Sequence, residues 1–142
     1  MKMLIKRVSE TAIMPTRAKA GDAGLDFYAD EPMVLEQLER HTFDTGIAVQ
    51  LPPGTVGYIT PRSGLAHKFG ATVLNGPGTV DQGYRGQVRI NLINTDPQPL
   101  VIAVGDRIGQ MVIHWFLTPE LVEVDELEPS ERGDGGHGST GK

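Results

Sequence analysis

The chain has 142 residues, a formal net charge of −5 and no cysteine. The length suits one domain with a buried core, the negative charge gives no general attraction to nucleic acid or to an anionic membrane, and the lack of cysteine excludes disulfides, thiol nucleophiles and cysteine-ligated metals. The first residues lack the apolar run of a signal peptide, and no stretch has the roughly 18 apolar residues of a membrane span, so we expect a cytoplasmic protein.

Short segments rich in β-branched and aromatic residues recur along the whole chain. Glycine (18) and proline (10) make up about a fifth of the residues, and they separate the apolar segments as turn residues do. This spacing predicts an all-β fold, a sandwich or a barrel. The expected strands are Leu4 to Val8, Gly24 to Ala29, Thr42 to Leu51, Thr55 to Thr60, Ala71 to Leu74, Gln87 to Asn94, Leu100 to Val104, Arg107 to Trp115 and Leu121 to Val124.

Local patterns predict one strand face, one turn and one short helix. In Gln87 to Leu92 apolar and polar residues alternate with the period of a strand that has one buried face, so Arg89 should point away from the core. Gln82-Gly83 should form a tight hairpin turn with Asp81 and Tyr84 opposite each other at its mouth. No long helix is expected, although Ser63 to Lys68 could form one or two helical turns.

The C-terminal segment differs in composition from the rest of the chain. We take residues 1–127 as the β domain and residues 128–142, which are rich in glycine and carry no core-forming side chain, as a flexible arm. Composition alone is typical of a frayed end, whereas the alternative is an arm whose N–H groups, hydroxyls and cations fold over an anionic ligand. Gly136 to Lys142 spells Gly-x-x-x-x-Gly-Lys, but the Ser/Thr and the helix of a P-loop do not follow, so we reject that motif.

Two segments combine groups that suit a phosphate and a metal ion. Pro61 to Ala66 follows a predicted strand and presents N–H groups, the Ser63 hydroxyl and the Arg62 guanidinium together, as a phosphate site would. The alternative is a helix start capped by serine. Ala20 to Phe27 places Asp26 at the start of a strand, where a carboxylate either caps a turn or holds a Mg2+ ion through its water molecules.

The densest cluster of ionisable and aromatic residues is Gly78 to Gly86. Asp81 could act as a general base on a water molecule, and Tyr84 could form a flat wall against a sugar or base. The alternative is that Asp81 favours the turn and Tyr84 belongs to a cross-strand pair. Gly105 to Gln110 is another polar turn before a strand, and the histidines lack the spacing of zinc ligands.

Taken in order, these segments resemble the five motifs of the trimeric dUTPase family, from about residue 20 to the C-terminus. The matching segments are Ala23 to Asp26, Pro61 to Ala66, Asn75 with Gly78 to Gly86, Gly105 to Gln110, and Arg132-Gly133 with Gly136 to Gly141. The resemblance implies a jelly-roll-like β fold and a homotrimer with three active sites at subunit interfaces. It also implies Mg2+-assisted hydrolysis of dUTP to dUMP and pyrophosphate, which limits uracil in DNA and supplies dUMP for thymidylate synthesis.

The resemblance implies a role for each matching residue. Asp81 would orient and deprotonate the water that attacks the α-phosphorus, and Asp26 would hold the hydrated Mg2+ ion. The phosphate chain would be contacted by Arg62, Ser63, Gly64, Arg89, Gln110 and, as an arginine finger, Arg132. The nucleoside would be contacted by Asn75, Thr79 and Val80 at the uracil edge and by Tyr84 at the deoxyribose. The closing arm would add His137, Gly138, Ser139 and Thr140.

One position departs from the family pattern, and two alternative functions stay open. Many family members have Phe where this chain has His137, whose smaller ring titrates near neutrality. The dCTP deaminases resemble this chain in the Pro-Arg-Ser segment, but they use a catalytic Glu and typically a second Ser where Gly64 stands. A non-catalytic nucleotide-binding module is the other alternative, and the joint presence of four residues argues against it: Asp26, Asp81, Tyr84 and Arg132.

Overall fold

The structure, a computed structural model, describes residues 1–135. These residues form ten strands and one short helix, and the strands pair antiparallel. The strands are β1 (Leu4–Arg7), β2 (Leu25–Tyr28), β3 (Met33–Leu35), β4 (Arg40–Gln50), β5 (Thr55–Thr60), β6 (Ala71–Val73), β7 (Gly78–Val80), β8 (Gln87–Asn94), β9 (Leu100–Ile102) and β10 (Arg107–Trp115). The prediction of an all-β fold is confirmed.

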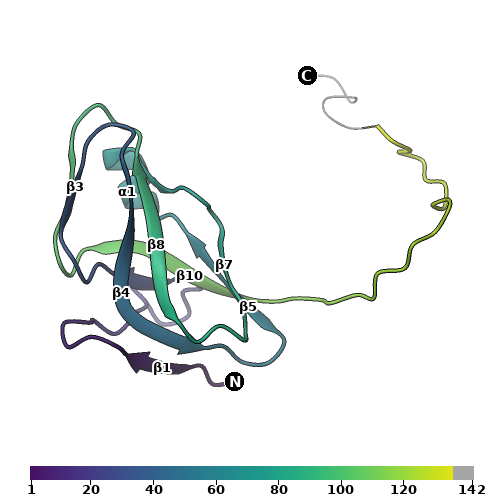
Figure 1. The fold of residues 1–142 in the computed structure, drawn as a ribbon, viewed down its shortest axis with the longest axis horizontal. Helices are drawn as coiled ribbons and strands as arrows, with labels where there is room; N and C mark the ends of the chain where they lie inside the picture. The colour runs from purple at the N-terminus through teal and green to yellow at the C-terminus, as the bar shows by residue number, and fades with distance from the viewer. Residues whose placement is uncertain (136–142) are drawn as a thin grey trace.

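Two four-stranded sheets enclose the core (Figure 1). Their strand orders are β1-β4-β8-β6 and β2-β10-β5-β7, and β3 and β9 form a third, two-stranded sheet. Phe43 and Leu92 from the first sheet and Phe27 and Met111 from the second are at most 1% exposed and belong to one apolar cluster. Burying these side chains supplies the main favourable term in folding, because apolar surface leaves water.

The strands predicted up to Trp115 are all present, but two details differ from expectation. The strands β3 and β7, three residues each, were not predicted. The segment Leu121 to Val124 contains no strand. The outward direction of Arg89 is confirmed, since this residue is exposed between the buried Val88 and Ile90.

The hairpin predicted around Gln82-Gly83 is wrong. The strand before it, β7, pairs with β5, whereas the strand after it, β8, pairs with β4 and β6. Residues 81–86 therefore carry the chain from one sheet to the other. A turn is nevertheless present, because the Tyr84 N–H donates to the Asp81 carbonyl at 3.0 Å.

The one helix, α1 (Ser63–Phe69), begins directly after β5 and positions Arg62. Arg62 is the N-cap residue, with extended backbone and no side-chain cap bond, so serine does not cap this helix. Gly70 ends the helix in the left-handed conformation (φ 58°), and its N–H reaches the carbonyls of Leu65 and Ala66. No helix in the part of the chain that the structure describes is long and apolar enough to cross a bilayer.

Residues 116–135 leave the two sheets and extend away from them (Figure 1). Their root is held by the Phe116 N–H, which donates to the Gly54 carbonyl at 3.2 Å. Beyond it, Leu117, Leu121 and Leu127 are 92%, 92% and 87% exposed. These three large apolar side chains therefore face water in the single chain.

The buried Asn94 provides a test of the polar contacts inside this fold. It is 0% exposed, and its amide donates to the Leu35 and Gln98 carbonyls and accepts from the Asp96 N–H, each at 2.9 Å. We expect Asn94→Leu to lower the free energy of unfolding by about 2 kcal/mol or more, because three backbone groups lose their partners. Urea unfolding at fixed protein concentration checks this against Gln98→Met, and equal midpoints would contradict it.

Candidate active site

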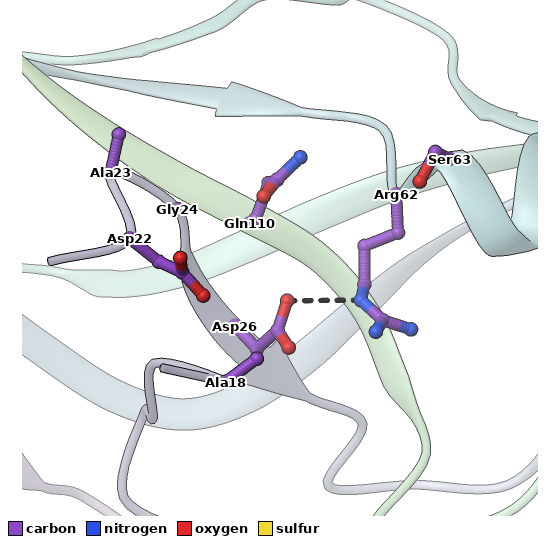
Figure 2. Close-up of a pocket in the computed structure, with 8 residues that line it drawn as sticks. All are labelled: Ala18, Asp22, Ala23, Gly24, Asp26, Arg62, Ser63 and Gln110. Carbon is purple, nitrogen blue, oxygen red and sulfur yellow. Dashed lines mark hydrogen bonds and ion pairs between the residues drawn. The ribbon is translucent and has the colours of Figure 1, made fainter. Parts of the chain in front are cut away.

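A polar pocket lies beside the start of α1 and contains four of the predicted site residues (Figure 2). The lining residues are Ala18, Asp22, Ala23, Gly24, Asp26, Arg62, Ser63 and Gln110. They come from the loop before β2, from β2, from the start of α1 and from β10. Two segments predicted separately, one for a metal and one for phosphate, therefore meet in one pocket, which we call the phosphate pocket.

Asp26 is the centre of the phosphate pocket and is only 7% exposed. Its Oδ1 accepts from Arg62 Nε at 2.9 Å, and its Oδ2 accepts from Arg107 Nη1 at 3.4 Å. Arg62 Nη1 also donates to the Arg107 carbonyl at 3.4 Å. A buried carboxylate without partners would be strongly destabilising, so the two guanidinium groups explain how it is tolerated. The contacts use Nε and Nη1 of Arg62 and leave Nη2 available to an anion.

Gln110 adds an amide to the phosphate pocket because Gly24 has no side chain. Gln110 pairs with Asp26 in the β2–β10 register, and its Nε2 donates to the Pro61 carbonyl at 3.1 Å. A Cβ on Gly24 would overlap Gln110 Oε1. Figure 2 shows the Gln110 side chain between Gly24 and Ser63. A side chain at position 24 would therefore displace the Gln110 amide from this space.

The residues of the phosphate pocket fit a Mg2+ ion held through water. Within residues 1–135 no group of three or more His, Asp or Glu side chains is placed to hold a metal, which argues against a dedicated cage. The Asp26 oxygens each accept one hydrogen bond and keep a further lone pair. Mg2+ usually keeps several waters and takes phosphate oxygens as ligands, so one partly free carboxylate is sufficient.

A second pocket lies where the chain passes from β7 to β8, and we call it the nucleoside pocket. Its lining residues are Thr79, Val80, Asp81, Tyr84, Gln87, Val88 and Arg89. Asp81 and Tyr84 are exposed, and Arg89 Nε donates to Asp44 Oδ1 at 2.8 Å. Five predicted site residues thus share this pocket.

The Tyr84 side chain is hydrogen-bonded within the nucleoside pocket. Its hydroxyl donates to the Gln87 carbonyl at 2.9 Å. A Cβ on Gly86 would overlap that hydroxyl, so glycine at this position lets the ring lie flat along the turn. Asn75 lies next to the same region, with its Nδ2 at 3.3 Å from the place a Cβ on Gly78 would take.

The two pockets share no lining residue, and the remaining predicted site residues lie elsewhere. Gly64 is in the first turn of α1, with open space around it. Arg132 lies on the extended segment and donates to the Gly135 carbonyl at 2.9 Å. His137, Gly138, Ser139 and Thr140 lie outside the described residues. Within one chain, Asp81 and Arg62 line different pockets.

Two residues with site contacts were not among the predicted site residues. Arg107 was predicted only as part of the polar turn Gly105 to Gln110, yet it reaches Asp26; its place in the same segment as Gln110 was the available signal. Gln82 follows Asp81 and accepts from the Gly54 N–H at 2.6 Å. No sequence signal indicated that contact, because its partner is 28 positions away.

Comparison with known proteins gives one consistent result. Residues 10–141 match the sequence pattern of the dUTPase family. A deoxyuridine 5'-triphosphate nucleotidohydrolase of Clostridium kluyveri is 47% identical over 141 residues, covering 99% of each chain. The enzyme of the same name from Nocardia farcinica is 50% identical over 138 residues, covering 96% of this chain and 84% of its own.

Solved structures agree with the sequence comparison. A variant dUTPase of Staphylococcus bacteriophage 80alpha, with dUpNHpp, superposes with a TM-score of 0.89 at 32% identity and covers 99% of both chains. A mutant dUTPase from phage phi11 of S. aureus, whose structure reveals the coordination of a structural Mg(II) ion, gives a TM-score of 0.84 at 31% identity over 91% of this chain and 100% of its own.

The close approach of Gln110 to Gly24 gives a test of the phosphate pocket. We expect Gly24→Ala to displace the Gln110 amide and to weaken the binding of pyrophosphate about tenfold, since a hydrogen bond to a charged group contributes roughly 1.5–3 kcal/mol. Isothermal titration of pyrophosphate into the protein with Mg2+ measures this. Gly83→Ala is the matched control, because a Cβ there meets nothing within 4 Å. Equal affinities for the two variants would contradict the assignment.

Proposed function

The chain belongs to the dUTPase family, and from that premise we propose that it hydrolyses dUTP to dUMP and pyrophosphate. The observation that carries the proposal is the pair of pockets, one with arginine, serine and a carboxylate for a Mg2+-bound phosphate chain, the other with Asp81 and Tyr84 for a nucleoside and a water. We propose that the protein acts in the cytoplasm. There this reaction would limit uracil in DNA and supply dUMP for thymidylate synthesis.

Asp81 is the proposed general base. Its carboxylate would accept a proton from a water molecule whose oxygen forms a bond to the α-phosphorus, while the bond from that phosphorus to the α,β-bridging oxygen breaks. Pyrophosphate then leaves with the electron pair of the broken bond. In the single chain Asp81 is exposed, so the site must exclude bulk water by other means before a positioned base is most effective.

The phosphate pocket is the proposed site of the triphosphate. Arg62 Nη2, the Ser63 hydroxyl, the Gly64 N–H and the Gln110 amide would donate to phosphate oxygens, with Ser63 near the bridging oxygen where negative charge grows. Asp26 would hold Mg2+ through its waters, and the bound ion would neutralise part of the phosphate charge. Arg89 would add a cation from the nucleoside pocket.

The nucleoside pocket is the proposed site of the base and sugar. Asn75 and the backbone of Thr79 and Val80 would hydrogen-bond to the uracil edge, and β7 holds that backbone rigid through its pairing with β5. The Tyr84 ring would pack on the deoxyribose and leave no room for a 2'-hydroxyl. The anchoring of its hydroxyl on the Gln87 carbonyl supports this rejection of ribose, because the ring cannot move aside freely.

We propose further that three copies of the chain assemble and share their sites. Two observations support shared sites: Asp81 and Arg62 line separate pockets within one chain, and the segment that carries Arg132 extends away from both sheets (Figure 1). The exposed leucines of that segment, Leu117, Leu121 and Leu127, would be covered by a neighbouring copy.

The end of the chain would then close over a neighbour's site. In this proposal residues 1–127 form the β domain and residues 128–142 form the arm, with Arg132 acting on the γ-phosphate as an arginine finger. Ser139, Thr140 and Gly138 would add donors, and His137 would stack on uracil. Ordering a glycine-rich segment is entropically costly, so closure would depend on bound substrate.

The reaction is tested by pyrophosphate release from dUTP, with UTP, dTTP and dCTP compared in Mg2+ and in EDTA. We expect release from dUTP alone, in Mg2+ alone, and a fall in kcat of about 10²–10⁴-fold for Asp81→Asn, the usual contribution of a general base. Ammonia from dCTP with dUTP intact would instead identify a deaminase. No reaction with any nucleotide would identify a binding module.

Shared sites are tested by mixing two inactive chains. We expect Asp81→Asn and Arg62→Ala to be inactive alone, and to regain activity when unfolded, mixed and refolded together, because some interfaces then combine an intact Asp81 with an intact Arg62. For random assembly of a cyclic trimer about a quarter of the sites should be restored. The control mixes Arg62→Ala with Ser63→Ala, whose defects lie in the same pocket. Equal activity in both mixtures would contradict shared sites.

A further inference from the structure

Asp81 lies just beyond the part of the backbone that strand pairing fixes. The pairing of β7 with β5 ends at Val80, opposite Gly57, and β8 begins at Gln87. Within residues 81–86 the described contacts are mostly internal: the Tyr84 N–H donates to the Asp81 carbonyl, and Arg85 Nη1 donates to the Gln82 and Tyr84 carbonyls. These contacts shape the turn, and the Tyr84 hydroxyl, which donates to the Gln87 carbonyl, joins its far end to β8.

One hydrogen bond joins this turn to a distant segment. Gln82 Oε1 accepts from the Gly54 N–H at 2.6 Å, and Gly54 lies between β4 and β5. The bond starts one residue from the proposed base and ends beside the first residue of β5, Thr55, which is 1% exposed. It therefore connects the Asp81 turn to the turn that leads into β5.

Gly54 also holds the root of the C-terminal segment. Its carbonyl accepts from the Phe116 N–H at 3.2 Å. Its φ of +76° favours glycine, and the Trp115 ring lies at 3.3 Å from the place a Cβ would take. Gly54 thus contacts the Asp81 turn through its N–H. It contacts Phe116 through its carbonyl and Trp115 on the side where a Cβ would stand.

We propose that Gln82 is a positioning residue for Asp81, and that Gly54 couples the Asp81 turn to the root of the C-terminal segment. The inference rests on the proposed function, in which Asp81 activates the water. Residues 115–116 hold the Gly54 backbone in place. The hydrogen bond from the Gly54 N–H to Gln82 then holds the neighbouring Asp81 in position. The phosphate pocket and the strand β7 do not depend on this bond.

The coupling predicts which kinetic constant changes. The uracil edge would be read by residues up to Val80, which strand pairing holds, whereas the water is oriented by Asp81, which Gln82 holds. Loss of the Gln82 bond should therefore lower kcat and leave KM nearly unchanged, the pattern of an interaction that matters in the transition state. A general loss of structure would instead lower the unfolding temperature or change both constants.

The first experiment compares substitutions of Gln82 in the full chain. We expect Gln82→Met, similar in length but without an acceptor, to lower kcat for dUTP about tenfold, since small misplacements of a catalytic group cost up to about 10²-fold. Gln82→Glu keeps an acceptor oxygen and should retain most of the kcat. Gln37→Met is the matched control on the turn between β3 and β4, and all variants should unfold at the wild-type temperature.

The outcomes of this comparison separate two failures. If the wild type releases no pyrophosphate from dUTP, the proposed function is wrong. If the wild type is active and Gln82→Met has the wild-type kcat, the positioning role is overturned. It is also overturned if Gln82→Met loses activity only together with its folded state and Gln82→Glu does not restore kcat. A tenfold loss in kcat with unchanged KM, restored by glutamate, supports it.

The second experiment tests the coupling through Gly54. Phe116→Pro removes the N–H that donates to the Gly54 carbonyl. If both bonds act on Asp81 through Gly54, the double variant Gln82→Met with Phe116→Pro should lose less kcat than the product of the two single losses. Losses that multiply would show that the two bonds act independently, and would overturn the coupling.

Discussion

A carboxylate that is 7% exposed, Asp26, lies between the guanidinium groups of Arg62 and Arg107. These three residues belong to β2, to the N-cap of α1 and to β10, so one set of charge-assisted hydrogen bonds fixes three elements around the phosphate pocket. Removing either arginine would leave a buried charge with one partner fewer. The orientation of Arg62, and with it the availability of Nη2 to a phosphate, depends on this arrangement.

Much of the fold could be predicted from the sequence because the signals were local. Alternation in Gln87 to Leu92 and turn residues between apolar runs identified the longer strands. The pairing could not be predicted, because it depends on which segments meet in space: β7 joins β5 rather than β8, although a glycine turn follows it. Leu121 to Val124 has the composition of a strand, yet a single chain offers it no partner.

The candidate site was predicted through motifs rather than through geometry. The motifs placed Asp26 and Arg62 in two separate segments and Asp81 with Tyr84 in one, and the structure brings the first pair into one pocket and keeps the second pair in another. They gave no information about residues whose partners lie far away in sequence, such as Gln82 with Gly54. Contacts of that kind determine how firmly a motif residue is held, and only a three-dimensional structure contains them.

The extended segment after Trp115 affects how a newly synthesised chain folds and assembles. Its leucines are about nine-tenths exposed, so a chain whose two sheets have folded still exposes an apolar segment. In the proposed assembly other copies would cover that segment, and until they do the chain can associate with unrelated partners or aggregate. The rate at which copies meet is set by how much protein the cell makes at one time, so the yield of correctly assembled protein should rise with expression up to the point where aggregation competes.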